Sequence, residues 1–393
     1  QERDAALLMC GASLVLVDEP PQQGSTRWVR LADVEAAGGS PDDRPIDATT
    51  PFYVGFTSGS TGRPRALVRD HRAWVSSFFA MSTEFGIGEG DVVVVPGSLF
   101  FSFSLIAALH ALFAGATVVF PRHPGALSLA SALDARPGAM HILPSLLAQT
   151  LRVAEGHRQA FPLLRSIICA GERLAPEVKR AVPGVFPNAR LYEYYGASEF
   201  GFATILTPGE HEARPGSVGR PFLGCDIAVV DEKGDLCPPH ETGLLQVRNA
   251  YGPVAVYGEG GGALPPAGAW RTAGDLAWRD AEGYVYLAGR RDNMVVINGE
   301  NIYPEEVERI LSALDGMVEV AVVPWPADTP THVIAVLEAG DGVPDAPRVL
   351  RHCKAHLSAR KVPRKVVYVE ALPLTATGKI DRAKVTELVL SRG

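Results

Sequence analysis

Strand-like and helix-like segments alternate from residue 51 to about residue 194, and this alternation limits the fold more than any other feature. Short runs rich in β-branched and aromatic residues are each followed by a longer segment of helical character. Such alternation is typical of an α/β fold with mostly parallel sheets, whose functional loops leave the carboxyl ends of the strands. We expect strands at 51–56, 91–95, 117–120, 139–143, 166–169 and 190–194, and helices at 72–85, 99–116 and 145–154.

The longest apolar run, residues 99–116, just reaches the length of a membrane span. A Pro-Gly pair at 96–97 precedes it and the strand-like segment 117–120 follows directly. We therefore expect a buried helix between two strands, not a membrane span. A helix in that position is also a candidate wall for an apolar substrate pocket.

The texture of the chain changes twice beyond this region. Shorter β-rich pieces follow residue 216, and from about residue 293 a compact segment has its own helices and strands. A short charged stretch joins the two parts and is a candidate hinge. We expect a large domain over 1–289 that includes a β-subdomain at 216–288, a hinge at 290–292, and a small mobile C-terminal α+β domain over 293–393.

Composition narrows the possible partners and the compartment. The net charge of -7 argues against a nucleic-acid surface, which needs clustered cations. The first residues are charged and lack the apolar core of a signal peptide. The five cysteines show no C-x-x-C pair, so neither a disulfide framework nor a zinc site is indicated, and we predict a cytoplasmic protein. They are Cys10, Cys169, Cys225, Cys237 and Cys353.

Residues 57–62, Thr-Ser-Gly-Ser-Thr-Gly, combine hydroxyl side chains with glycines more densely than an ordinary turn requires. Glycines let the backbone approach a ligand closely, and hydroxyls and free amides suit phosphate oxygens. Arg65 adds a permanent positive charge. The spacing is not that of a Walker A loop. On these residues alone, a phosphate-binding loop and a plain surface loop remain alternatives.

Two further segments bring chemically useful groups together. Tyr195, Ser198 and Glu199 lie at one predicted strand end, where a ring suits a purine, a hydroxyl suits a phosphate and a carboxylate suits Mg²⁺. Asp275 follows Gly274 and offers a carboxylate for two ribose hydroxyls. Taken alone, each segment is equally a common strand-to-loop transition or a turn.

Five motifs in a fixed order, spanning residues 56–382, resemble those of the adenylate-forming superfamily, which includes acyl-CoA synthetases, luciferases and adenylation domains. The motifs lie at 56–68, 192–199, 271–276, 289–308 and, with the lysine, 373–382, and a further segment at 170–174 resembles the family's other side of the adenine slot. The resemblance implies an ATP and AMP site formed by Thr57, Ser58, Gly59, Ser60, Thr61, Gly62, Gly171, Glu172, Arg173, Tyr195, Gly196, Ser198, Asp275 and Arg290.

The resemblance also implies catalytic roles. Lys379 would bridge the substrate carboxylate and the α-phosphate, while Arg65 offsets charge at the phosphates. Glu199 would hold Mg²⁺, and Asp292 would be the hinge about which the small domain turns.

The acyl pocket is predicted from position in the motifs. Its candidates are Phe101, Ser102, Phe103, Gly171 and Ala197. Relatives that activate amino acids place an aspartate near Ser102 to hold the substrate ammonium. Because no carboxylate stands there, we predict a fatty or aryl acid that lacks an α-amino group.

The reaction implied is ATP-dependent formation of an acyl-AMP with release of pyrophosphate, followed by thioester formation with CoA. The partners would be a small carboxylic acid, ATP, Mg²⁺ and CoA. One alternative is loading of a carrier-protein phosphopantetheine. Another is a catalytically impaired homologue, suggested by the short N-terminal region, by Arg65-Ala66 in place of Lys-Gly, and by an extra residue, Ala273, in the Thr-Gly-Asp motif.

Overall fold

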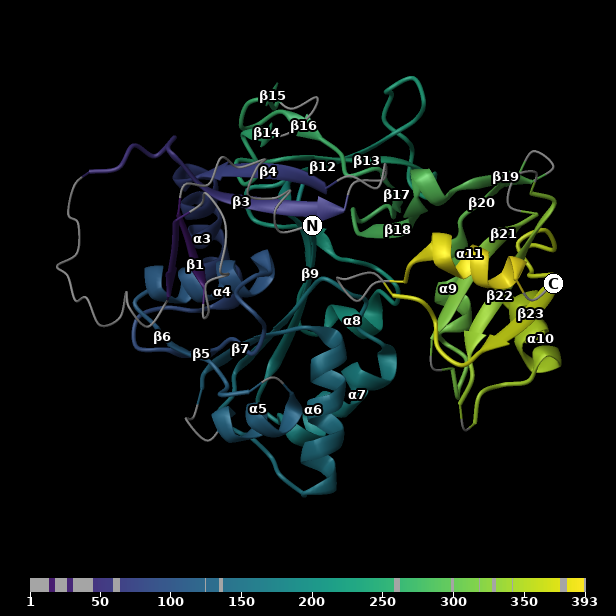
Figure 1. Cartoon of the computed structure of the whole chain (residues 1–393), viewed down its shortest axis with the longest axis horizontal. Coiled ribbons are helices and arrows are strands. Elements are labelled where there is room, and N and C mark those ends of the chain that lie inside the picture. Colours follow the sequence, from purple (N-terminus) through teal and green to yellow (C-terminus); the bar gives the residue numbers. More distant parts are fainter. Residues whose placement is uncertain are drawn as a thin grey trace.

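The computed structural model describes twelve segments of the chain, which together contain nearly all the predicted elements (Figure 1). They are residues 14–17, 27–30, 45–58, 64–123, 125–133, 137–257, 262–297, 300–317, 319–326, 330–340, 342–374 and 380–391.

A seven-stranded sheet forms the centre of the larger part of the molecule and confirms the predicted α/β fold. Five neighbouring strands run parallel to one another. Two further strands lie at one edge, and each is antiparallel to the strand beside it. Their order is β11 (Arg220–Pro221), β10 (Gly201–Leu206), β9 (Arg190–Ala197), β8 (Ser166–Cys169), β7 (Ala139–Ile142), β5 (Val92–Val94) and β6 (Thr117–Val119).

Helices cover both faces of this sheet because side chains alternate along each buried strand. On β7, Ala139 packs in the cluster that contains α3 and α4, whereas Met140 packs in the cluster that contains the other helices. The helices are α3 (His71–Phe85) and α4 (Ser102–Phe113) on one face, and α5 (Ala126–Leu133), α6 (Pro144–Gly156) and α7 (Pro176–Val185) on the other.

The helix expected over 99–116 is present but shorter. It begins at Ser102, after the exposed residues Leu99, Phe100 and Phe101, and ends at Phe113. Among the helices of the described segments, none has the length and apolarity that a membrane crossing requires.

An antiparallel sheet holds the segments around the predicted phosphate loop, and it differs from the parallel arrangement expected there. β3 (Pro51–Ser58) pairs with β4 (Pro64–Asp70), which pairs with β14 (Ala255–Tyr257) and then β15 (Gly262–Ala263). The strand at 255–257 was expected in the β-subdomain. It instead pairs with β4 on the side that β3 does not cover. Residues 66–70 of β4 are all buried, so their backbone groups need hydrogen-bond partners there.

The β-subdomain itself is a five-stranded antiparallel sheet. It contains β12 (Asp226–Val230), β13 (Gly243–Arg248), β16 (Trp270–Arg271), β17 (Asp275–Arg279) and β18 (Val285–Arg290). Phe200 and Ala203 beside and on β10 pack into the core of this sheet, so the subdomain is fixed to the central sheet near the end of β9.

The C-terminal part has the predicted α+β character. Its three-stranded sheet has one apolar cluster on each face, one covered by α9 and α10 and the other by α11. A helix at the C-terminal end was not expected from the sequence. The elements are η1 (Arg291–Asn293), β19 (Val295–Ile297), β20 (Glu300–Ile302), α9 (Pro304–Leu311), β21 (Val320–Trp325), β22 (His332–Glu338), α10 (Ala346–His356), β23 (Lys365–Val369) and α11 (Arg382–Leu390).

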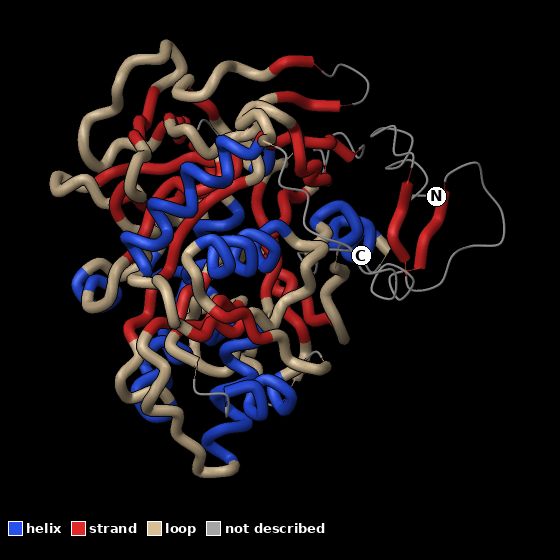
Figure 2. The backbone as a smooth tube through the Cα atoms, turned by 90° about the vertical axis from the view of Figure 1, so that its left-hand side faces the viewer, coloured by secondary structure: helices blue, strands red, loops and turns tan. Residues whose placement is uncertain are grey.

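Two short elements near the start form a separate pair. β1 (Leu14–Val17) and β2 (Arg27–Arg30) run parallel and lie to one side of the other strands (Figure 2). The apolar run 13–17 predicts a strand, which β1 confirms, whereas β2 lies in a polar segment that predicts none. The sequence also predicts a short helix from residue 5 that leads into this strand, and that helix lies outside the described residues.

Candidate active site

The predicted phosphate loop joins the two strands of a hairpin. Thr57 of β3 pairs with Arg65 of β4, and Ser58 pairs with Pro64 at the end of the ladder. Arg65 is exposed. The remaining predicted residues of this loop, together with Lys379, lie outside the described residues; they are Gly59, Ser60, Thr61 and Gly62.

Three predicted nucleotide-binding residues from distant motifs meet in what we call the Tyr195 cluster: Tyr195, Asp275 and Arg290. The Tyr195 hydroxyl donates a hydrogen bond to Asp275. Asp275 and Arg290 are opposite each other on β17 and β18, and the Arg290 Nε lies 3.5 Å from the Asp275 carboxylate. Burial is the main cause that raises the pKa of the Tyr195 phenol well above its usual value, and the adjacent Asp275 carboxylate raises it further. The phenol therefore remains a hydrogen-bond donor.

The glycine positions next to this cluster have clear geometric reasons. A Cβ on Gly196 would lie 2.3 Å from the carbonyl oxygen of Gly201, so β9 and β10 approach too closely for a side chain. Gly274 has a φ of +84°, a conformation that favours glycine. The Thr272 hydroxyl accepts a hydrogen bond of 3.0 Å from the Gly274 amide. The extra alanine is thus accommodated in a turn before Asp275.

Arg69 is a candidate functional residue that the sequence did not single out. Its guanidinium is buried and donates to the carbonyl oxygens of Ser198, at 2.7 Å, and Tyr251, at 3.4 Å. Burial lowers the pKa of Arg69 to about 10, and the charge of nearby Glu199 opposes that shift. Arg69 ties the hairpin sheet to the end of β9. Its one signal in the sequence is a second arginine four residues after Arg65.

Glu199 fits a metal that is held mainly by a nucleotide. Within the described segments, no three or more His, Cys, Asp or Glu side chains are grouped so that they could bind a metal ion. Mg²⁺ commonly takes one or two protein carboxylates together with substrate phosphates and water. A single half-buried carboxylate at the end of β9 is compatible with that donor set.

The segment Gly171, Glu172 and Arg173 follows β8 at the carboxyl edge of the sheet. Gly171 has a φ of +89°, and a Cβ there would lie 3.3 Å from Leu143. Burial and the nearby Arg309 of α9 lower the pKa of Arg173. This segment therefore lies where the C-terminal part approaches the central sheet.

The predicted acyl-pocket residues are only partly brought together. Phe103 lies with its ring centroid 6.2 Å from that of Tyr194 and 6.1 Å from that of His141. Phe101 is half exposed and Ser102 is exposed. Ala197 is half-buried at the end of β9, and Gly171 lies at the end of β8.

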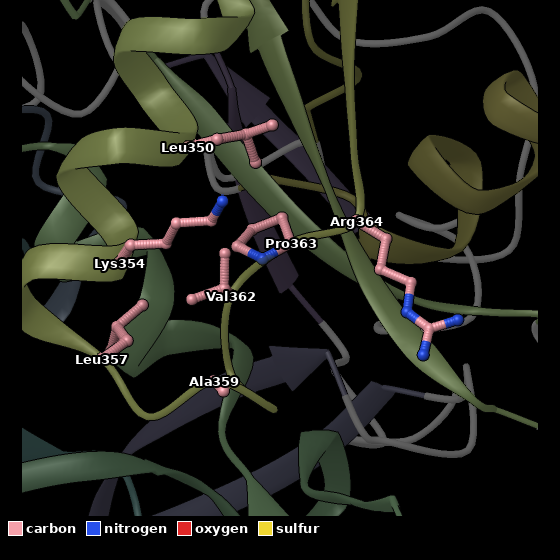
Figure 3. A pocket seen from close by; sticks show the side chains of 7 residues that line it. All are labelled: Leu350, Lys354, Leu357, Ala359, Val362, Pro363 and Arg364. Atoms are coloured by element: carbon pink, nitrogen blue, oxygen red, sulfur yellow. The ribbon is translucent and has the colours of Figure 1, made fainter.

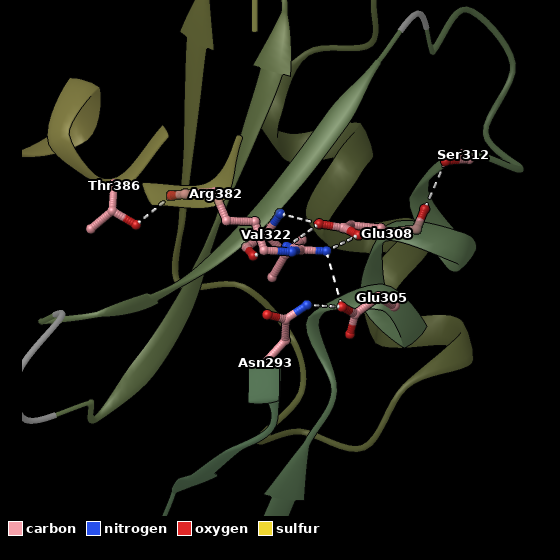
Figure 4. A network of polar contacts seen from close by, with 7 residues as sticks. All are labelled: Asn293, Glu305, Glu308, Ser312, Val322, Arg382 and Thr386. Carbon is pink, nitrogen blue, oxygen red and sulfur yellow. Dashed lines mark hydrogen bonds and ion pairs between the residues drawn. The ribbon is translucent and has the colours of Figure 1, made fainter. Parts of the chain in front are cut away.

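A second polar cluster, which we call the Arg382 cluster, connects the hinge region to the lysine loop (Figure 4). Arg382 donates to both carboxylate oxygens of Glu308 at 2.7 Å and to Glu305 at 3.3 Å. It also donates to the carbonyl of Val322 at 2.8 Å. Asn293, next to the exposed Asp292, donates to Glu305 at 2.5 Å.

The loop that contains Lys379 begins and ends beside this cluster. Leu374 and Ile380 form a β-bridge, and the Asp381 side chain caps α11, which begins at Arg382. The Arg382 cluster therefore fixes the chain at Arg382, three residues after Lys379.

The C-terminal part also has a surface hollow of about 480 Å³, outside both clusters (Figure 3). It contains none of the predicted site residues. Its lining is mainly apolar, with Arg364 extending away from the other side chains. The lining residues are Leu350, Lys354, Leu357, Ala359, Val362, Pro363 and Arg364.

Comparison with known proteins gives two family matches. Residues 10–252 match the model of the AMP-binding enzyme family, and residues 306–379 match that of the AMP-binding enzyme C-terminal domain. An uncharacterized acyl-CoA ligase, YhfT from Bacillus subtilis, is 34% identical over 90% of this chain and 72% of its own length. Benzoate-CoA ligase from Thauera aromatica is 31% identical over 89% of this chain and 67% of its own.

A solved structure shares the fold. O-succinylbenzoate coenzyme A synthetase from Bacillus subtilis, in complex with ATP and magnesium ion, superposes with a TM-score of 0.84 at 23% identity. The superposition covers 98% of this chain and 81% of the other.

Proposed function

Because the chain belongs to the AMP-binding enzyme family, we propose that the Tyr195 cluster holds the nucleotide of an ATP-dependent, AMP-forming acid-thiol ligase. The reaction is activation of a carboxylic acid as an acyl-AMP, followed by thioester formation with CoA, as expected for a relative of acyl- and aryl-CoA ligases. The convergence of Tyr195, Asp275 and Arg290 from three separate motifs is the observation that carries the assignment of the site.

We assign the nucleotide roles from the donors that each group offers. The Asp275 carboxylate accepts two hydrogen bonds from ribose hydroxyls, and Arg290 beside it supplies a cation. The Tyr195 ring provides a face for adenine. Ser198, whose carbonyl is held by Arg69, presents its hydroxyl to the α-phosphate.

The charges suit a reaction between two anions. The substrate carboxylate attacks the α-phosphorus of ATP, the bond to the β-phosphate oxygen breaks, and pyrophosphate leaves. Glu199 would hold Mg²⁺, which neutralises charge on the phosphates when bound. Arg65 and Lys379 offset the remaining charge, and closure of the C-terminal part about Asp292 would exclude water from the mixed anhydride.

We propose an aryl or other apolar acid as the substrate. Phe103 and Tyr194 supply aromatic surface at the predicted acyl pocket, and Ser102 stands where an ammonium would need a carboxylate. The similarity to benzoate-CoA ligase supports an aromatic acid.

The test is carboxylate-dependent exchange of labelled pyrophosphate into ATP over a panel of aliphatic and aromatic acids. We expect exchange with at least one carboxylic acid that lacks an α-amino group, and CoA-dependent release of AMP with that acid. Exchange without a response to CoA would favour a carrier protein as the acceptor. ATP binding without exchange under any condition would indicate a catalytically impaired homologue and contradict the proposal.

A further inference from the structure

His141 is a deeply buried polar side chain on β7. Its exposed fraction is 1%, and neither ring nitrogen has a hydrogen-bond partner in the segments that the structure describes. A buried polar group left unpaired costs free energy, so such a group in a folded protein requires an explanation. A substrate group that binds there would supply one.

The imidazole is neutral near pH 7. Burial, with a smaller contribution from His110, lowers the pKa of His141 to about 3. A neutral imidazole has one N–H donor and one nitrogen acceptor. A group that can both donate and accept can therefore pair with whichever nitrogen it meets.

The surroundings of His141 are aromatic. The ring centroid of Phe85 lies 5.7 Å from that of His141, edge to face, and that of Phe103 lies at 6.1 Å. Tyr194 is within 6.2 Å of Phe103. These side chains come from α3, α4 and β9 and face β7 on one side of the central sheet. An aromatic ring is the kind of molecule that such a wall accepts.

His141 also lies next to the predicted acyl pocket. It is two residues before Leu143, which is the residue that a Cβ on Gly171 would contact at 3.3 Å. On its other side is Phe103, which follows Ser102 at the start of α4. The imidazole thus lies between two groups of residues already assigned to the acyl substrate.

We propose that His141 is the hydrogen-bonding subsite for the tail of the acyl substrate, and that this substrate is an aromatic carboxylic acid bearing a ring hydroxyl. A hydroxyl can donate to the unprotonated imidazole nitrogen or accept from the protonated one, so it pairs with the nitrogen that faces it in either tautomer. A second carboxylate would bury a charge beside a neutral ring, and a bare ring would leave the imidazole unpaired. This inference rests on the proposed function, because it names the substrate class of the same site.

The experiment measures binding of non-hydrolysable acyl-adenylate analogues, the acyl sulfamoyl adenosines, by calorimetry. Matched pairs carry a benzoyl group with and without a hydroxyl at each ring position. We expect at least one hydroxylated analogue to bind the wild-type protein about tenfold more tightly than its parent. His141→Phe should abolish that preference, and His141→Gln, which still donates and accepts, should retain part of it.

His110→Phe is the matched control. His110 on α4 is also fully buried, but one of its nitrogens is 2.9 Å from the Ser82 hydroxyl. The variant should keep the wild-type preference, and thermal unfolding of all variants verifies that they are folded.

The inference is overturned if no hydroxylated analogue is preferred, if no analogue binds, or if folded His141→Phe keeps the preference. Pyrophosphate exchange tests the proposed function separately. A preserved hydroxyl preference in analogue binding, with no exchange for any acid, would contradict the catalytic function and leave the subsite standing.

Discussion

The Tyr195 cluster and the Arg382 cluster each contain an arginine beside a carboxylate, and they differ in how exposed that arginine is. Arg382 is 25% exposed and donates to two carboxylates and a backbone carbonyl. Arg290 is 50% exposed, its Nε is 3.5 Å from the Asp275 carboxylate, and it donates to the carbonyl of Ala273. A cation enclosed by carboxylates stabilises the fold, whereas a cation that is half exposed beside a carboxylate is accessible to a ligand. We therefore interpret the Arg382 cluster as structural, and we propose the Tyr195 cluster as the binding site.

Lys379→Ala gives the largest expected effect, and it tests whether the segment anchored by the Arg382 cluster reaches the chemistry of the other cluster. We expect adenylation to slow by about a thousandfold, because one cation that stabilises developing charge is removed. ATP affinity should change little. Single-turnover acyl-AMP formation and equilibrium ATP binding measure the two effects, and a normal adenylation rate would remove Lys379 from the mechanism.

Arg382→Met should destabilise the C-terminal part by about 3 kcal/mol, because Glu308 and Glu305 would lose their shared cation while half-buried. Denaturant unfolding measures this loss. Arg382→Lys, which retains the charge but loses the planar fork, is the control and should recover part of the stability. Unchanged stability of the Met variant would remove the distinction between the clusters.

Acid should weaken the larger part of the molecule through its buried histidines. Burial lowers the pKa of His110 to about 4 and that of His141 to about 3. The unfolded chain takes up these protons below about pH 6.5, whereas the folded chain does so only near the lowered values. The free energy of unfolding is therefore highest above about pH 6.5, and it decreases as the pH falls toward the lowered pKa values.

The expected loss is about 2 kcal/mol for each histidine at about pH 5, since one pKa unit corresponds to about 1.4 kcal/mol. Denaturant unfolding between pH 7 and 5 measures it. His141→Phe should flatten the profile relative to the wild type, and an identical profile would show that His141 titrates normally.

Asp275→Ala should affect binding more than stability, as expected for an open cluster. The KM for ATP should rise about tenfold because the ribose hydroxyls lose their acceptor, which corresponds to about 1.4 kcal/mol. Asp275→Glu keeps the charge and is the matched variant. A large loss of folding stability in Asp275→Ala, with an unchanged KM, would place this cluster in the structural class.

Asn293→Ala should have the smallest effect, a loss of about 1 kcal/mol of stability from its hydrogen bond to Glu305. Adenylation should stay within about twofold of the wild-type rate. Asn293→Asp would place a like charge beside Glu305 and should destabilise more. If the alanine variant instead slowed only thioester formation, the Arg382 cluster would have a role in the hinge motion.

The sequence predicted much of this arrangement where the signal was local. The parallel strands and their helices follow from apolar periodicity, and the Tyr195 cluster was assembled from motifs whose residues meet as expected. The pairing of β14 with β4 joins segments almost 190 residues apart and leaves no local pattern. Arg69 is likewise recognisable only when its buried contact with Ser198 is known. Long-range strand pairing and the burial of polar side chains could therefore not be predicted from the sequence.

Every member of the Arg382 cluster comes from the segment between Asn293 and Arg382. The polar contacts that hold the start of α11 thus all lie within this segment. Among the described residues, the central sheet contributes no charged group to them. A chimera in which residues 293–391 replace the C-terminal part of a related ligase would therefore retain the Arg382 cluster. Its side chains would need to be matched to the new partner only at the surfaces where the two parts touch.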